Sequence, residues 1–188
     1  MTAPATGTLV RVEPRTAAFE FRQSNQSAEF LDGGDEEEDE GRSYIRQGQL
    51  LHAVFASIRQ AGDLPQALAR LRFEGVIDSD EQEQRIRQLA TWALRHPQAQ
   101  RWYDGSWELY NERTILYTDE DGQLQTRRPD RVMRKDGQVV VVDFKFGKPK
   151  EEHHRQVAEY MRLLADMGHT DIEGYLWYVF RGEMVKIQ

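Results

Sequence analysis

Asp136-Gly137 separates two strand-like segments, and this pattern limits the possible fold more strongly than any other feature of the chain. An Asp-Gly pair between alternating apolar residues favours a tight β-turn, so Arg128–Met133 and Val139–Phe146 are predicted to form an antiparallel hairpin. The turn also fixes which residues oppose each other. In the resulting register Asp130 lies directly opposite Asp143, and both side chains are on one face of the hairpin.

This predicted carboxylate pair indicates a metal site. Opposed residues have Cβ atoms roughly 4.5–5.5 Å apart, so Asp130 and Asp143 repel each other unless a cation or a proton lies between them. Mg²⁺ prefers carboxylate oxygens and keeps several waters, which suits such a pair. Lys145 is on the same face, about 7 Å along the strand, where it can hold an attacking water or stabilise charge on a phosphate.

A surface hairpin with a solvated charged face is the alternative interpretation, because an Asp-x-Lys sequence alone is common. Two observations favour the metal site. Pro129 precedes Asp130, and the opposite face of the second strand is a continuous apolar row that is suited to pack on a helix. This row consists of Val140, Val142, Phe144 and Phe146.

The rest of the pattern predicts helices followed by a sheet with one inserted crossover helix, which is a mixed α/β domain. Ser79 opens one of the helices with a capping-box pattern. Beside the hairpin, helices are predicted from Ser43 onwards and over Leu64–Phe73, Ser79–Arg95 and Glu151–Met167, and strands over Leu109–Tyr117, Tyr175–Phe180 and Met184–Ile187. The compact domain is therefore expected to span residues 43–188.

Residues 1–42 are predicted to be a largely disordered linker that ends in an acidic run. The net charge of the chain is −7, and the stretch Asp32–Glu40 alone holds seven acidic residues and no basic one. The remainder is neutral, so the overall charge does not exclude a phosphate-binding surface. The chain has no cysteine, which excludes disulfides, thiolate metal sites and cysteine nucleophiles. No apolar run has the length of a membrane span or a signal core, and a cytoplasmic location without membrane contact is expected.

Four motifs give the chain a resemblance to a known family. Arg128-Pro-Asp-Arg-Val132 followed by Val141-Val-Asp-Phe-Lys-Phe-Gly147 resembles the PD-(D/E)XK nuclease core. Gly48-x-x-x-His52 and Gln156-x-x-x-Tyr160 resemble two further motifs of the RecB/AddA-type nuclease domain, the C-terminal domain of UvrD/Rep-like helicase–nucleases. The resemblance implies a restriction-endonuclease-like mixed sheet of about five strands flanked by helices.

The resemblance also implies an activity and its partners. The expected activity is hydrolysis of DNA phosphodiester bonds with Mg²⁺ or Mn²⁺, in DNA end processing and recombinational repair. Endonuclease and exonuclease action both remain open. The expected partners are DNA, the helicase domains of a parent chain and a second helicase–nuclease subunit. The alternative function is a non-catalytic DNA-binding or regulatory module with the same fold, and a third possibility is a protein-interaction domain that acts through the acidic run.

The family assigns roles to particular residues of this chain. His52 is implied as a third metal ligand beside Asp130 and Asp143, and the Phe144 backbone carbonyl as another. Lys145 is implied as a catalytic residue together with the two aspartates. Two further supporting roles are implied: contact with DNA or ordering of the lysine by Gln156 and Tyr160, and an acidic residue before the hairpin at Glu112, with Glu108 as its alternative. Independently of the family, basic residues near the site are predicted to bind phosphates, Arg128 and Arg131 among them.

Some other residues are expected to be structural. The aromatic clusters around Trp102 and Trp177 are predicted to pack in the core rather than to stack on bases. His153 and His154 are predicted to lie on the surface.

Overall fold

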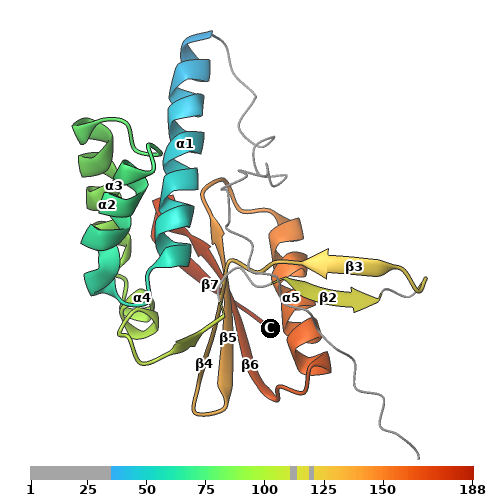
Figure 1. Cartoon of the computed structure of the whole chain (residues 1–188). Helices are drawn as coiled ribbons and strands as arrows, with labels where there is room; N and C mark the ends of the chain where they lie inside the picture. Colours follow the sequence, from blue (N-terminus) through green and yellow to red (C-terminus); the bar gives the residue numbers. More distant parts are fainter. Residues whose placement is uncertain (1–34, 111–113, 119–120) are drawn as a thin grey trace, which may run out of the picture.

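The computed structural model describes residues 35–110, 114–118 and 121–188 of the chain. Its helices come first and are followed by strands with one inserted helix, in the order that the sequence predicts (Figure 1). In chain order they are α1 (Asp35–Ser57), η2 (Ala61–Asp63), α2 (Leu64–Phe73), α3 (Asp80–Ala93), α4 (Pro97–Trp102), β1 (Glu108–Leu109), β2 (Ile115–Thr118), β3 (Leu124–Arg127), β4 (Arg131–Lys135), β5 (Gln138–Lys145), α5 (Glu151–Asp166), β6 (Asp171–Tyr178), η3 (Val179–Arg181) and β7 (Glu183–Ile187).

Five strands form the central mixed sheet, in the order β1-β4-β5-β6-β7. Strands β5 and β6 run parallel, and α5 is the crossover between them. The other neighbouring strands of the sheet are antiparallel. The predicted α/β class, with about five strands flanked by helices, is therefore confirmed.

The β4–β5 hairpin has the register that the sequence predicts. Its pairs run from Lys135 opposite Gln138 to Arg131 opposite Val142. The turn residues Asp136 and Gly137 have φ values of 51° and 90°. Positive φ at both central positions is typical of the two-residue turn that matches the twist of antiparallel strands.

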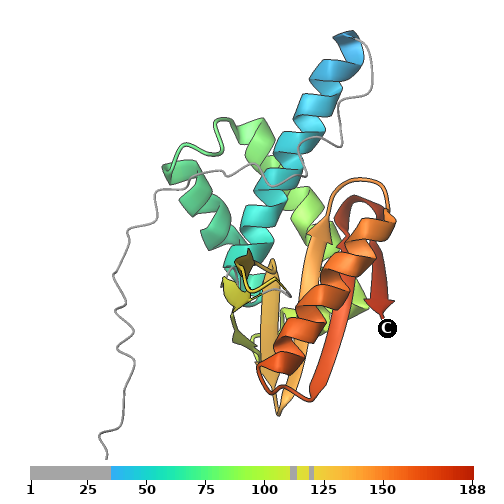
Figure 2. The ribbon, with the colours of Figure 1, turned by 90° about the vertical axis from the view of Figure 1, so that its right-hand side faces the viewer.

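The two faces of the sheet are covered by different helices (Figures 1 and 2). Helices α1 to α4 pack on the face that carries Val140, Val142 and Phe144, so the predicted apolar row lies in the larger core cluster. Helix α5 packs through Val157, Tyr160 and Leu164 on the opposite face, against residues such as Val139 and Val141. Of the aromatic residues predicted to be structural, Trp102 and Trp177 are fully buried.

Helix α1 begins at Asp35, eight residues before Ser43, so the predicted linker to residue 42 is wrong for its last part. Acidic residues in the first turn of a helix stabilise it, because they face the unpaired N–H groups at the positive end of the helix dipole. Residues 1–34 lie outside the described residues. No helix of the described ranges combines the length and the apolar character that a membrane crossing requires.

The predicted single strand over Leu109–Tyr117 is also wrong. It is two short strands that belong to different sheets: β1 pairs with β4 at the edge of the central sheet, and β2 pairs with β3 in a separate two-stranded hairpin. The helix α4 was not predicted. It starts at Pro97 with His96 as its N-cap, and the His96 ring accepts a hydrogen bond from the Gln98 N–H.

Candidate active site

Asp130 is held at the open end of the β4–β5 hairpin, directly before β4 begins. The last paired residues are Arg131 and Val142, so the next position in the register is Asp130 opposite Asp143. The Asp130 Oδ2 atom accepts a 2.7 Å hydrogen bond from the Phe144 backbone N–H. This bond fixes the carboxylate beside the strand that carries Asp143, which is the juxtaposition the sequence predicts.

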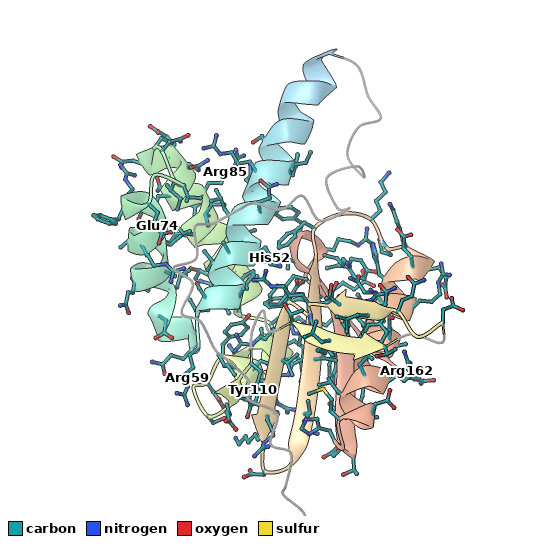
Figure 3. All side chains as sticks on the ribbon, turned by 45° about the vertical axis from the view of Figure 1, so that its right-hand side comes forward. His52, Arg59, Glu74, Arg85, Tyr110 and Arg162 are labelled. Carbon is teal, nitrogen blue, oxygen red and sulfur yellow. The ribbon has the colours of Figure 1, made fainter. Side chains whose placement is uncertain are left out.

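Helix α1 brings His52 to the same carboxylate, and Figure 3 shows His52 where this helix meets the sheet. The His52 Nε2 atom lies 2.8 Å from Asp130 Oδ1, and its ring packs edge-on against Phe144 with centroids 5.9 Å apart. Gly48, one turn earlier, allows this approach, because a Cβ atom there would lie 3.1 Å from the Phe146 side chain. The Gly-x-x-x-His spacing thus seats α1 closely on the strand end.

Lys145 connects β5 to α5 through a chain of polar contacts. Its Nζ atom lies 2.8 Å from Asp143 Oδ2 and donates a 2.9 Å hydrogen bond to Gln156 Oε1. The Gln156 Nε2 group then donates to the Tyr160 hydroxyl at 2.8 Å. Of the two roles proposed for Gln156 and Tyr160, this geometry corresponds to the ordering of the lysine.

The two aspartates have opposite electrostatic environments. Burial would raise the pKa of Asp130, but the His52 ring, the Phe144 N–H and Lys145 outweigh it and hold this pKa below its ordinary value. Burial and the negative charge of Asp130 raise the pKa of Asp143 to about 7, despite the opposing effect of Lys145. Ionised Asp143 is therefore the less stable of the two carboxylates.

The donor set suits a divalent cation. Asp143 Oδ2 is buried, with Lys145 Nζ 2.8 Å away as its charged neighbour. Two neighbouring carboxylates in a buried site repel each other, and an oxygen-preferring cation between them would be stabilised. Within the described part of the chain, no three His, Asp or Glu side chains already stand together as a complete metal-binding group.

Arg131 is not a phosphate-binding residue, and that prediction is wrong. Its side chain is fully buried, and its guanidinium carbon lies 3.9 Å from the centroid of the Tyr103 ring. It donates to the carbonyls of Phe55, Ile58 and Trp102, at 3.3, 3.0 and 3.0 Å. These carbonyls lie at or near the C-terminal ends of α1 and α4, where a cation offsets the negative end of the helix dipole. Arg131 therefore joins two helix ends to the sheet.

The other predicted residues are distributed as follows. Arg128 is exposed, two residues before Asp130. Glu112 lies outside the described residues. Its alternative, Glu108, is on β1 opposite Arg134, near the turn of the β4–β5 hairpin and away from Asp143. His154 is partly exposed.

His153 is buried, so its predicted surface position is wrong. Its Nδ1 atom lies 3.1 Å from the Tyr178 hydroxyl, and both side chains are buried where α5 packs on β6. Position 153 stands one turn before Val157 on the apolar stripe of the helix, and this spacing was the signal in the sequence.

A cluster on α5 was missed by the sequence analysis. Glu159 accepts hydrogen bonds from the Tyr117 hydroxyl at 2.9 Å and from Arg127 Nε at 2.8 Å, which attaches the β2–β3 hairpin to α5. No local pattern predicts it, because the three residues come from elements whose packing is set only by the complete fold.

The mixed sheet with its crossover helix and the site at the end of its central hairpin define a restriction-endonuclease-like protein. The chain belongs to the PD-(D/E)XK nuclease superfamily, whose family model matches residues 18–186. No curated protein matches the chain. Membership implies a phosphodiesterase of the nuclease class with a DNA substrate, and nucleases of this superfamily typically use divalent metals.

Proposed function

We propose that this chain is a deoxyribonuclease that requires Mg²⁺ or Mn²⁺, with its active site at Asp130, Asp143 and Lys145. The observation that carries the proposal is the opposed carboxylate pair, in which Asp130 is fixed beside the strand of Asp143 and its charge, together with burial, raises the pKa of Asp143. This pair is costly for the protein alone and becomes favourable with a divalent cation.

The cation would be held by Asp130 and Asp143, with His52 and the Phe144 carbonyl as the further ligands that the family resemblance implies. His52 presents the same Nε2 atom that now faces Asp130 Oδ1 at 2.8 Å. A cation bound by these residues would supply activation of water and neutralisation of charge on the phosphate.

The residues of the chain supply orientation and charge. Lys145 has three N–H donors and uses its contacts with Asp143 and Gln156 to hold a fixed direction. Its remaining donor capacity is available for a phosphate oxygen or for the attacking water, where it would offset the developing negative charge. Gln156 is itself held by Tyr160, so the pair orients the lysine without contacting the reacting atoms.

The test is a cleavage assay of the whole chain on end-labelled single-stranded and duplex DNA, with Mg²⁺, with Mn²⁺ and with EDTA. We expect metal-dependent shortening of the DNA, abolished in Asp143→Asn and in Asp130→Asn. Asp166→Asn, an exposed carboxylate at the end of α5, is the matched control and should cleave like the parent. DNA binding without cleavage under every metal condition would instead show a non-catalytic DNA-binding module and would refute the proposal.

We propose further that the domain serves a helicase–nuclease of the RecB/AddA type in the repair of DNA ends. The support is the order of four motifs, together with the contacts of His52 with Asp130 and of Gln156 with Lys145. The coding sequence around this chain provides the test. A G-x-x-x-x-G-K-[ST] motor motif in the same or an adjacent reading frame is expected, and its absence from both would refute this assignment.

A further inference from the structure

The β2–β3 hairpin stands outside the central sheet and lies beside α5 (Figures 1 and 2). Glu159 attaches it to α5 by accepting from both Tyr117 and Arg127. The Arg127 guanidinium carbon also lies 5.6 Å from the centroid of the Tyr117 ring. This cluster, which we call the Glu159 clasp, contacts one side of the hairpin and leaves the other side uncovered by α5.

The hairpin is joined to the active site at its base. Strand β3 ends at Arg127, three residues before Asp130. On the helix, Glu159 directly precedes Tyr160, which belongs to the chain of contacts from Lys145. The end of β3 therefore lies close in the chain to the carboxylate pair, and a ligand bound along the uncovered side of the hairpin would extend towards Asp130.

The uncovered side of the hairpin carries two exposed leucines. Leu116 and Leu124 have 64% and 71% of their surface exposed. Leu116 opposes Thr126 and Leu124 opposes Thr118, so the two leucines are diagonal neighbours on one face. The exposed Arg128 directly follows β3 and lies two residues before Asp130. Two leucines, two threonines and an arginine thus form one strip, which we call the outer strip.

We infer that the outer strip binds single-stranded DNA and guides it to the carboxylate pair, a role that rests on the proposed nuclease function. Unpaired bases present apolar faces that leucine side chains can cover, as leucine wedges do between base steps. The hydroxyls of Thr118 and Thr126 and the Arg128 guanidinium suit phosphate oxygens. Arg128, the charged residue of the strip, is positive and lies two residues before Asp130, which favours this polyanion over a basic protein partner.

The test compares DNA binding by variants in an Asp143→Asn background, where cleavage does not consume the DNA. Three proteins are titrated into a fluorescent single-stranded oligonucleotide, and binding is measured by fluorescence anisotropy. They are the Asp143→Asn protein itself, the same protein with Leu116→Ser/Leu124→Ser, and the same protein with Phe73→Ser. Phe73 is 92% exposed at the end of α2 and serves as the matched control for loss of exposed apolar surface. We expect about a tenfold higher Kd for the double variant and less than a twofold change for the control.

Salt dependence and kinetics separate the two kinds of contact. Arg128→Gln should reduce the slope of log Kd against log salt by about one, whereas the leucine variant should leave that slope unchanged. In the cleaving protein, Glu159→Gln loosens the clasp and should raise KM for single-stranded DNA about threefold or more, with kcat unchanged. Thermal melting of each variant confirms that it is folded.

An unchanged Kd and KM in the leucine double variant would overturn this inference while leaving the nuclease function intact. A double variant that binds DNA normally but loses a co-purifying protein would show a protein-binding surface, and would also overturn it. Failure of the parent chain to cleave any DNA would instead count against the proposed function, and the anisotropy titration would still report on the strip.

Discussion

Asp143→Asn should change how the stability of the protein depends on pH. Burial and the charge of Asp130 raise the pKa of Asp143 from 3.8 to about 7. Between these two values the folded state holds a proton that the unfolded state releases, so the free energy of unfolding falls as the pH rises through this window. A shift of about three units, at about 1.4 kcal/mol per unit, corresponds to about 4 kcal/mol lost between pH 4 and pH 8.

Asparagine at position 143 cannot ionise, so this loss disappears from the variant. The free energy of unfolding of Asp143→Asn, compared with that of the parent, should therefore rise by about 3 kcal/mol between pH 4.5 and pH 8. This value is below the roughly 4 kcal/mol that the full pKa shift allows, because the pH range covers only part of the titration. The measurement is urea unfolding in EDTA at several pH values, with free energies from linear extrapolation. Asp130→Asn should show a smaller gain over the same pH range, because it removes the charge that helps to raise the pKa of Asp143 but leaves the burial of Asp143 unchanged. Asp166→Asn is the exposed control and should run parallel to the parent.

The reasoning would be refuted if the free energy of unfolding changed with pH in the same way in Asp143→Asn and in the parent. Asp143 would then have the same pKa in the folded and the unfolded chain. Addition of Mg²⁺ at pH 8 provides an internal check. A cation that binds only the folded state stabilises it by mass action, by about 1.4 kcal/mol at tenfold its Kd. We expect this stabilisation in the parent and its loss in Asp143→Asn.

Three further outcomes follow from the contacts. Arg131→Met should lower the free energy of unfolding by about 4 kcal/mol and Tm by about 10 °C in calorimetry, because it leaves several buried carbonyls without a donor; a Tm within 2 °C of the parent would contradict this role. Gln156→Ala should lower kcat about tenfold, measured by cleavage under saturating Mg²⁺, with metal affinity unchanged, and a simultaneous loss of metal binding would show that Gln156 maintains the site itself. His52→Ala should raise the Mn²⁺ Kd at least tenfold by calorimetric titration, and an unchanged Kd would make His52 a packing residue.

The β4–β5 hairpin could be predicted in detail because its determinants are local. A two-residue Asp-Gly turn fixes the register, and strict alternation then places every side chain on one face or the other. The same alternation also explains the error at Arg131. This residue opposes Val142, so it lies on the apolar face, but its charge suggested solvent and its burial depends on distant carbonyls of α1 and α4.

Contacts between elements that are remote in sequence were less predictable. Gln156 and Tyr160 share a helix face, which the spacing shows, but the contact of Gln156 with Lys145 depends on how the crossover helix α5 packs across the parallel strands. The alternation of apolar and polar residues over Leu109–Tyr117 does not show that this segment divides into β1 and β2. The division appears only in the pairing partners, since β1 pairs with β4 and β2 pairs with β3. Helix α1 extends to Asp35 because clustered acidic residues suit a helix N-terminus as well as they suit a linker.

The central claim is that Asp130 and Asp143 together bind a divalent cation. Titration of Mn²⁺ into the chain, followed by electron paramagnetic resonance of the free ion, tests it without any DNA. We expect saturable binding by the parent and by Lys145→Met, since the lysine is not a ligand, and its loss in both Asp130→Asn and Asp143→Asn. Equal Mn²⁺ binding by the parent and both aspartate variants would contradict the claim.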